Sequence, residues 1–205
     1  MPMTDNPQVW IVDDDQQVRQ SLAWLLGSVG IDAQGYADAQ RFLEAYSPKT
    51  PGCLLLDVRM PGMGGLALQK HLKTLDPCLP VILLTGHGDV AMAVSAMKAG
   101  AFDFFEKPFN DQQLIDCIQR ALNENQHAIL QASQYNELVE RYACLTPREQ
   151  EVLSLLLKGE PAKVIADRLF ISPKTVDVHR SKVMSKMQAD SLADLVRLCQ
   201  PLELI

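Results

Sequence analysis

The first 122 residues alternate short apolar runs with stretches of helical periodicity, and this alternation restricts the fold more than any other feature of the sequence. Strands that alternate with helices form a parallel sheet with helices on both faces. The runs "CLLLD" (53–57) and "VILLT" (81–85) have the continuous apolar character of central strands. We therefore expect an α/β fold, a doubly wound, flavodoxin-like five-stranded parallel sheet with the strand order 2-1-3-4-5.

The boundaries of these elements follow from where each pattern begins and ends. The patterns predict strands at 8–12, 32–36, 53–57, 81–84 and 101–106. They predict helices at 16–28, 38–46, 66–75 and 89–98, and a fifth helix from 111 onward. Residues 110–113 have the spacing of a capping box, so the fifth helix is expected to begin there.

Residues 123–143 separate this domain from the rest of the chain. The segment is rich in Gln, Asn and Glu, and its apolar residues are sparse. It contains neither Gly nor Pro, so nothing in it ends the preceding helix. We expect a linker that is at least partly helical and continues the last helix of the first domain. A flexible polar linker is the alternative.

Residues 144–205 have helical patterns only, interrupted by capping and helix-breaking residues. Ser, Thr and Asp cap helix N-termini, proline favours the first helical position, and glycine ends helices. We therefore expect a small all-α domain of four short helices. The capping and breaking residues are Thr146-Pro147 with Glu149, Gly159, Pro161, Ser172-Pro173, and either Asp190 or Ser191.

Charged and polar residues follow the expected strands at their carboxyl ends. Asp13-Asp14-Asp15 follow the first strand, Asp57 ends the third, Thr85 ends the fourth, and Lys107 follows the fifth. In open α/β folds, ligands bind at the edge where parallel strands deliver their carboxyl ends. Neighbouring acids raise one another's pKa, and Mg²⁺ relieves this repulsion because it prefers carboxylate and carbonyl oxygens. Phosphoryl transfer needs such positioning and charge stabilisation, with Asp57 as a carboxylate nucleophile.

Each of these signals has an ordinary structural explanation. Acids after a strand are often helix N-caps, a lone Asp or a Thr-Gly pair is often part of a turn, and Lys-Pro often marks a solvated corner. Their coincidence at the ends of the proper strands favours a phosphoryl-transfer site over those explanations.

With these motifs in place, residues 5–122 resemble the receiver domain of two-component response regulators. The resemblance implies a receiver domain at 1–122, with Asp57 as the phosphoacceptor and Mg²⁺ as the cofactor, which Mn²⁺ could replace. It implies that Asp14 binds the ion directly, that Asp13 assists largely through water, and that the main-chain carbonyl of Arg59 completes the protein ligands.

The same resemblance assigns roles to three residues on the last two strands. Lys107 is expected to contact the phosphoryl group, Thr85 to turn its hydroxyl toward it after phosphorylation, and Phe104 to be the aromatic switch residue. One departure concerns the loop after the acceptor, where Gly64 stands in place of the Asp or Asn of many members. That departure bears on the rigidity of the loop more than on the chemistry.

The end of the chain differs from the beginning in charge. Residues 1–140 carry 9 Lys/Arg and 17 Asp/Glu, whereas residues 144–205 carry 9 and 8. Within the latter, a short helix at 162–170 is joined by "ISP" to a locally basic helix, which is a helix-turn-helix arrangement. The basic helix buries Val176, Val183 and Met187 on one side, so its other side is free to enter a major groove. An ordinary bundle helix with solvated charges is the alternative.

Residues 145–187 resemble the LuxR/NarL-type helix-turn-helix through "LTPREQEVLSLLLKG", "IADRLFIS", "TVDVHRSKV" and "KM". This implies a DNA-binding domain at 144–205. Glu160-Pro161 replaces the usual Ser-Asn, and Asp177 stands where many members carry a lysine that faces DNA. An aspartate can accept a hydrogen bond from cytosine N4 but repels phosphate. The expected DNA contacts, besides Asp177, are Val178 and Ser181 to bases, and Lys174, Thr175, Arg180 and Lys182 to phosphate.

Together the two parts resemble the FixJ/NarL class of transcription regulators, and "TGHGDVAMAVSAMKAGAFDFFEKPF" is most similar to the FixJ branch. This implies a sensor histidine kinase and promoter DNA as partners, a homodimer after phosphorylation, RNA polymerase as a further partner, and no membrane association. We expect a regulator that activates transcription, and repression is the alternative. Its only expected reactions are phosphotransfer to itself and its own dephosphorylation.

Composition and spacing weigh against other classes. The five cysteines are scattered and never form C-x-x-C, which favours reduced thiols and a cytoplasmic location over disulfides or zinc. No apolar run approaches the ~18 residues of a membrane span, and no secretory signal is recognisable. An aspartyl-phosphate hydrolase usually has a second Asp two residues after the nucleophile, where this chain has Arg59. A receiver that never takes phosphate and serves only to bind protein is the other alternative.

Overall fold

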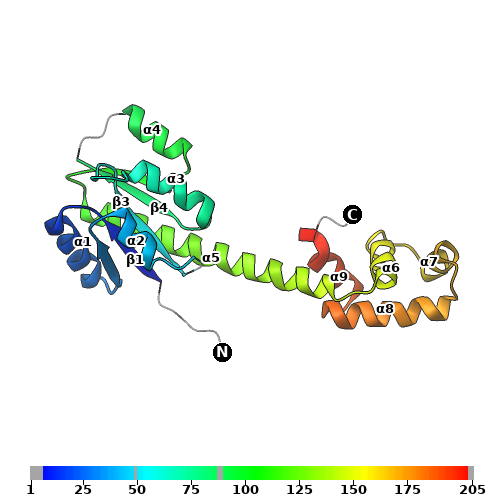
Figure 1. Ribbon diagram of the computed structural model, residues 1–205. Coiled ribbons are helices and arrows are strands. Elements are labelled where there is room, and N and C mark those ends of the chain that lie inside the picture. Colours follow the sequence, from blue (N-terminus) through cyan, green and yellow to red (C-terminus); the bar gives the residue numbers. More distant parts are fainter. Residues whose placement is uncertain (1–6, 49, 87–89, 203–205) are drawn as a thin grey trace. The chain divides into compact units, whose positions relative to one another are not determined.

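The structure is a computed structural model that describes residues 7–48, 50–86 and 90–202 (Figure 1). Contacts divide the chain into two compact units, Met1–Leu130 and Gln131–Ile205. The first is an α/β unit and the second is entirely helical in its described part. The two units are described separately below.

The first unit contains the expected five-stranded parallel sheet, and its order β2-β1-β3-β4-β5 confirms the order 2-1-3-4-5. The continuous apolar runs of β3 and β4 are buried throughout, because both lie in the middle of the sheet. The strands are β1 (Gln8–Val12), β2 (Ala33–Tyr36), β3 (Gly52–Asp57), β4 (Val81–Thr85) and β5 (Asp103–Glu106).

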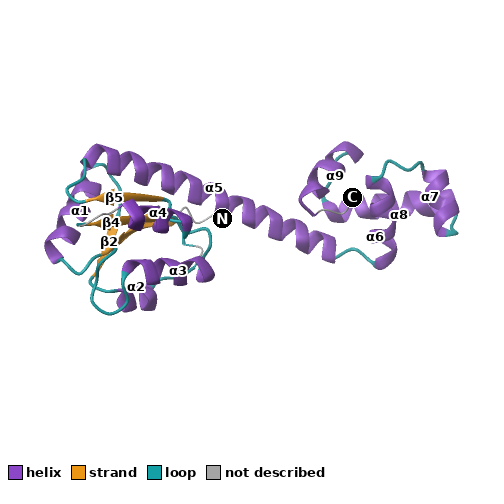
Figure 2. Cartoon of the chain, turned by 90° about the horizontal axis from the view of Figure 1, so that it is seen from above, coloured by secondary structure: helices purple, strands orange, loops and turns teal. Residues whose placement is uncertain are grey.

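Helices cover both faces of this sheet (Figure 2). Alternate strand residues point to opposite faces, so Leu54 and Leu56 join one core cluster while Cys53 and Leu55 join the other. The first cluster packs under α2, α3 and α4, and the second under α1 and α5. The bounds are α1 (Gln16–Ser28), α2 (Ala39–Ala45), α3 (Gly65–Leu75), α4 (Val90–Lys98) and α5 (Asp111–Ala143).

Most element boundaries agree with the sequence expectation to within one residue, and the start of the fifth strand differs by two. The fifth strand begins at Asp103 and not at 101, because residues 99–101 close the end of α4: Ala101 N–H donates to Ala96 O (3.0 Å) after Gly100 at a φ of 87°. The fourth helix was expected from 89, and residue 89 lies outside the described residues. At the start of α5, Asn110 Oδ1 accepts from Gln113 N–H (3.0 Å), as the capping pattern predicts.

The helix α5 is continuous over 33 residues. Asn125 fixes it to the first unit: its Oδ1 accepts from Gly52 N–H (2.8 Å) at the start of β3, and its Nδ2 donates to Cys78 O (2.7 Å). Asn125 is a polar side chain that is almost wholly buried, and both ends of its amide are satisfied.

The second unit contains four further helices around one core (Figure 1). Thr146 caps the first with the expected reciprocal capping box to Glu149, and Ser172 caps the third. Of the two candidates for the last cap, Ser191 is the N-cap, accepting from Asp194 N–H (3.1 Å). The helices are α6 (Pro147–Leu157), α7 (Ala162–Leu169), α8 (Pro173–Met187) and α9 (Leu192–Cys199), followed by the 3-10 turn η1 (Gln200–Leu202).

Candidate functional site

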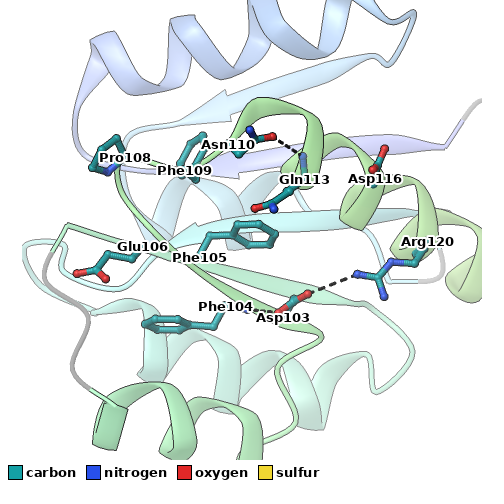
Figure 3. Close-up of a pocket in the computed structure, with 10 residues that line it drawn as sticks. All are labelled: Asp103, Phe104, Phe105, Glu106, Pro108, Phe109, Asn110, Gln113, Asp116 and Arg120. Atoms are coloured by element: carbon teal, nitrogen blue, oxygen red, sulfur yellow. Dashed lines mark hydrogen bonds and ion pairs between the residues drawn. The ribbon is translucent and has the colours of Figure 1, made fainter.

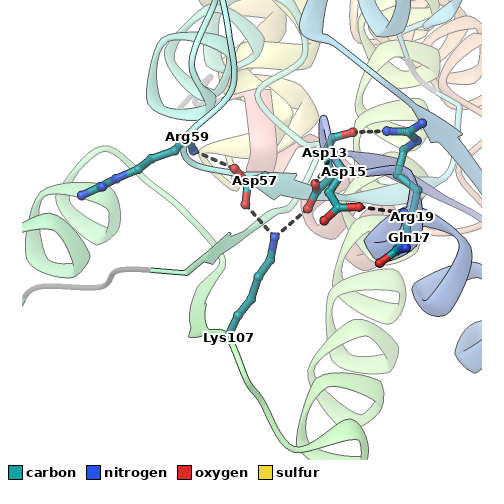
Figure 4. Close-up of polar contacts among 7 residues, drawn as sticks. All are labelled: Asp13, Asp15, Gln17, Arg19, Asp57, Arg59 and Lys107. Carbon is teal, nitrogen blue, oxygen red and sulfur yellow. Dashed lines mark hydrogen bonds and ion pairs between the residues drawn. The ribbon is translucent and has the colours of Figure 1, made fainter.

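Three side chains meet at the carboxyl edge of the sheet (Figure 4). β1 and β3 are neighbours, with Val12 paired to Leu56, so Asp13 and Asp57 leave adjacent strands at the same level. Lys107, which follows β5, reaches across: its Nζ lies 2.7 Å from Asp13 Oδ2 and 2.7 Å from Asp57 Oδ1. Both acids are buried, and the lysine side chain is mostly covered.

The second oxygen of each carboxylate is held by a main-chain N–H. Asp57 Oδ2 accepts from Arg59 N–H (2.8 Å), and Asp13 Oδ1 accepts from Asp15 N–H (2.9 Å). Arg19 in α1 adds a further bond, its Nη1 donating to the main-chain carbonyl of Asp13 at 2.6 Å. These bonds fix the orientation of both carboxylates, as a site that must position a reacting group requires.

Burial and charge act in opposite directions on the groups of this site. Burial raises the pKa of Asp13 above its ordinary 3.8, although the hydrogen bond from Lys107 works to lower it. Burial alone would lower the pKa of Lys107, but its hydrogen bonds to the two carboxylates outweigh that effect and its pKa is raised above 10.5. Lys107 is therefore a protonated ammonium that faces both carboxyl groups.

The other acids of the first loop have different environments. Asp14 is exposed, directly beside the buried Asp13. Asp15 is the N-cap of α1, its Oδ1 accepting from Gln17 N–H (2.8 Å). The ordinary explanation for an acid after a strand therefore applies to Asp15.

Thr85 ends β4 and is buried. β3 and β4 are neighbours in the sheet, and Asp57 of β3 pairs with Leu84 of β4. Thr85 is therefore one residue beyond the partner of Asp57. Its main-chain carbonyl accepts from Lys107 N–H (2.7 Å), which ties the β4 and β5 ends of the site together.

The loop after Asp57 comes very close to the strand. A Cβ atom on Gly65 would lie 2.2 Å from the Asp57 carbonyl oxygen and 2.9 Å from Val58 Cα, so only glycine fits at the start of α3. Gly64 is the N-cap of α3 and offers no side chain to cap it. Arg59 is exposed and its side chain points away from Asp57 (Figure 4). Arg59 therefore contacts the site through its main chain only.

The face of β5 carries the expected switch residue (Figure 3). Phe104 is half-buried and packs against the core cluster on the α4 side, whereas Phe105 packs against the α5 side. Phe104 pairs with Leu83 of β4. Leu83 is two residues before Thr85, so Phe104 and Thr85 lie on the same face of the sheet. A cavity of about 810 Å³ lies beside it, lined among others by Asp103 and Arg120, which form an ion pair of 3.6 Å.

Among the residues that the structure describes, no group of three or more Asp, Glu, His or Cys side chains is close enough to hold a metal ion. The two carboxylates that do converge have the hard oxygen donors that Mg²⁺ prefers, and carboxylate oxygens accept more than one contact. Asp14 directly follows Asp13 in the chain, and Arg59 lies two residues after Asp57. The chemistry of the donor set therefore fits a magnesium ion.

The second unit presents one face of α8 to solvent. Val176, Val183 and Met187 are buried in its core, as expected. Lys174, Val178 and Ser181 are exposed and share the opposite face, at spacings of four and three residues. Asp177 and Lys182 are exposed on the flanks of that face, whereas Arg180 is exposed nearer the core-facing side, four residues after the buried Val176. Thr175 is half-buried with its hydroxyl 2.8 Å from the Ser172 hydroxyl.

Sequence reasoning missed several residues that support or extend these sites. Arg19 and Asn125 gave no motif signal, because each bonds main-chain groups, which residue types do not reveal; the partner of Asn125 at Gly52 is also distant in the chain. Lys186 pairs with the buried Glu149 at 2.7 Å, which marks it as a structural residue. Ser185 is exposed on the same face of α8 as Ser181, a position that helical spacing alone could have identified.

Comparison with known proteins agrees with both halves of this description. The family "Response regulator receiver domain" matches residues 9–119, and the family "Bacterial regulatory proteins, luxR family" matches residues 143–199. In the described part of the chain, no helix is sufficiently long and apolar to span a bilayer.

Whole-length relatives are similar over both parts. The transcriptional regulatory protein FixJ of Bradyrhizobium diazoefficiens is 43% identical over 196 residues, which cover 96% of each chain. The response regulator protein TodT of Pseudomonas putida is 43% identical over 98% of this chain and 89% of its own. The solved structure of the response regulator StyR is 42% identical with a TM-score of 0.88, covering 95% of this chain and 98% of that one.

Proposed function

The chain belongs to the two-component response regulators that join a receiver domain to a LuxR-type DNA-binding domain, and we propose that it accepts a phosphoryl group on Asp57 from a sensor histidine kinase. The phosphorylated chain then dimerises, binds promoter DNA through α8 and activates transcription together with RNA polymerase. We assign the receiver domain to 1–122, the linker to 123–143 and the DNA-binding domain to 144–205.

One observation carries this proposal: Asp57 is a buried carboxylate at the end of a central strand, with an ammonium group 2.7 Å from one oxygen. A carboxylate nucleophile needs a cation beside it to stabilise the charge of the incoming phosphoryl oxygens. Lys107 supplies that charge, and its contact to Asp13 holds the ammonium in place before the donor arrives.

The phosphotransfer step needs little covalent chemistry from the rest of the chain. An Asp57 carboxylate oxygen attacks the phosphorus of phosphohistidine, the phosphorus–nitrogen bond breaks, and the imidazole leaves with the electron pair of that bond. Lys107 then contacts a phosphoryl oxygen, and the Thr85 hydroxyl turns toward another. Attack by water on the same phosphorus, with Asp57 as the leaving group, returns the free carboxylate.

Asp14, Asp13, Asp57 and the main-chain carbonyl of Arg59 would hold a Mg²⁺ ion, for which Mn²⁺ could substitute. When bound, the ion supplies positive charge that neutralises the phosphoryl oxygens. Asp13 and Asp57 share one ammonium group, so two acids face a single positive charge. This imbalance supports the assignment, because an ionised pair of acids with one cation still attracts a second cation.

The response to phosphorylation is a change on the β5 face. The phosphoryl group adds a charge of about −1.5 to −2. This charge draws in the Thr85 hydroxyl, and Phe104 moves into the space beside it. The face formed by α4, β5 and the start of α5 is thereby reshaped and dimerises, which brings two DNA-binding domains onto paired half-sites.

Sedimentation of the full chain tests the dimer step. With acetyl phosphate and Mg²⁺ the sedimenting mass should double, and Asp57→Asn should remain a monomer under the same conditions. A mass that stays unchanged despite stoichiometric phosphorylation would refute dimerisation while leaving the phosphoacceptor intact. Footprinting of genomic fragments with the phosphorylated protein then identifies the promoter.

A further inference from the structure

Phe170, in the turn between α7 and α8, combines an exposed apolar side chain with a left-handed backbone conformation. It is 95% exposed, the most exposed large apolar side chain among the described residues. Its φ is 55°, in the left-handed region that bulky side chains avoid. A lone exposed apolar residue needs no explanation, but one that is also held in a strained backbone conformation does.

The backbone geometry shows why this position requires a left-handed residue. Ile171 N–H donates to Ala166 O (3.0 Å) and Phe170 N–H donates to Asp167 O (3.4 Å), which is the hydrogen-bond pattern of a Schellman motif. Ile171 packs against the core of the unit. Glycine is the usual residue at the left-handed position of this motif, and Gly159 occupies the equivalent place after α6 with a φ of 72°.

The fold gains nothing from the phenylalanine ring. The ring has almost no contact with the protein, so burial does not compensate for the strain. The turn itself is held firmly from outside, because Arg148 in α6 donates through Nη2 to the Leu169 carbonyl and through Nη1 to Glu151 (2.7 Å). The backbone beside Phe170 is therefore held in place while its ring is exposed to solvent.

The residues around Phe170 indicate which kind of ligand its ring could contact. Phe170 stands two residues before Ser172, the N-cap of α8, and the N-terminal residues of a recognition helix are the ones that reach base edges. Residues 163–186 carry six Lys/Arg and two Asp. Lys186 and Arg168 pair with Glu149 and Glu160, and the other four cations give this part of the surface a charge complementary to phosphate. Val178, a large apolar side chain exposed on α8, lies on the face that includes Lys174.

We propose that Phe170 is a DNA-contacting residue whose ring packs on the edge of the groove that α8 enters, against a thymine methyl group or a deoxyribose. Phenylalanine makes apolar contacts of this kind with thymine. Burial of the ring in the complex stabilises binding and offsets the backbone strain of the free protein. This inference rests on the proposed function, since it assumes that α8 binds duplex DNA.

The test compares variants of the full chain on a short duplex that the wild-type protein selects from a random-sequence library. Phe170→Gly and Phe170→Asn remove the ring and suit the left-handed backbone. Both should raise the melting midpoint of the second unit and weaken DNA binding about tenfold. Phe170→Tyr keeps the ring and should retain wild-type affinity.

Two control variants distinguish loss of the ring contact from other causes of weaker DNA binding. Gln188→Gly changes the other left-handed non-glycine residue in the described part of this unit (φ 57°), beyond the far end of α8, and should leave affinity unchanged. Lys174→Ala should lower the slope of log affinity against log salt by about 1, because one phosphate contact is lost. Phe170→Gly should leave that slope unchanged, since the ring releases no counterion.

Three results would overturn the inference. Unchanged affinity of Phe170→Gly shows that the ring does not touch DNA. Unfolding of both variants shows that the ring serves the fold. Loss of transcription activation with wild-type DNA affinity assigns the ring to a protein partner. If the wild-type protein selects no duplex at all, the proposed DNA-binding function itself fails, which is distinct from these outcomes.

Discussion

Asp13 and Asp57, from two neighbouring strands, share one ammonium group: Lys107 Nζ lies 2.7 Å from an oxygen of each. Two buried acids facing a single cation form a site that is poised for a second positive charge. The same arrangement is costly to the free protein, because carboxylates lose hydration on burial. The two buried carboxylates therefore lower the stability of the free protein while they favour the binding of a second cation.

Asp13→Asn should stabilise the receiver unit and impair its phosphorylation. The pKa of Asp13 is raised by burial, so the folded state disfavours its charged form, and stability is lost as the pH rises through that pKa. Removing the charge should raise the free energy of unfolding at pH 7 by about 1 kcal/mol. Urea unfolding followed by the fluorescence of the buried Trp10 measures this change.

Asp15→Asn is the matched control for this prediction. Asp15 caps α1 from an exposed position, and asparagine caps helices as well as aspartate does. Its effect should stay within a few tenths of a kcal/mol. A less stable Asp13→Asn protein would contradict our account of the charge balance.

Asn125→Ala should destabilise the receiver unit by about 2–3 kcal/mol, because the buried Gly52 N–H and Cys78 carbonyl lose the side chain that satisfies them. The same urea titration measures the loss. Asn123→Ala is the control on the same helix, exposed and expected to change little. Equal effects at the two positions would show that the amide does not fix α5 to the sheet.

These residues also mark the limit of sequence reasoning. The apolar runs of β3 and β4 and the capping residues of α6 and α8 predicted their elements within one or two residues, because those patterns are local. The meeting of Asp13, Asp57 and Lys107 could be predicted because parallel strands end at one edge. The sequence could not decide whether residues 123–143 are helical or flexible, because a polar segment without glycine or proline is compatible with both.

The remaining features depend on main-chain hydrogen bonds, helix packing or backbone geometry that residue patterns do not reveal. Arg19 bonds a main-chain carbonyl, and no spacing rule reveals such a bond. The pairing of Glu149 with Lys186 joins two helices whose packing angle the sequence does not give. The strain at Phe170 becomes visible only when its φ and its exposure are known together.

Glu149→Gln should destabilise the helical unit at neutral pH but not in acid. The hydrogen bond from Lys186 and the capping bond to Thr146 lower the pKa of Glu149 from its ordinary 4.5 to about 2. A depressed pKa gives stability that is full above pH 4.5 and is lost as the pH falls toward 2. Since Lys186 is one-third exposed, the loss at pH 7 should be about 1–2 kcal/mol.

The amide resonances of residues 144–199 in urea, at pH 7 and near pH 2, measure this difference. Glu151→Gln is the control, since its ion pair with Arg148 is exposed and should contribute less than about 0.5 kcal/mol. A difference between Glu149→Gln and wild type that persists undiminished in acid would show that the carboxylate charge is not its cause.

Asp177→Ala should strengthen binding to random-sequence DNA about fivefold, because a carboxylate leaves the face that approaches phosphate. If Asp177 also accepts a hydrogen bond from cytosine, the ratio of selected to random binding falls at the same time. Fluorescence anisotropy with both duplexes measures the two effects. Asp190→Ala, beyond the other end of α8, should change neither.

Asp57 alone should receive the phosphoryl group, and intact-mass and peptide mass spectrometry measure this. After incubation with acetyl phosphate and Mg²⁺, the wild-type chain should carry one phosphoryl adduct on the peptide that contains Asp57. The Asp57→Asn chain, which keeps the shape but lacks the nucleophilic oxygen, should carry none. A wild-type chain that never acquires the adduct, or an equal adduct on Asp57→Asn, would contradict the account.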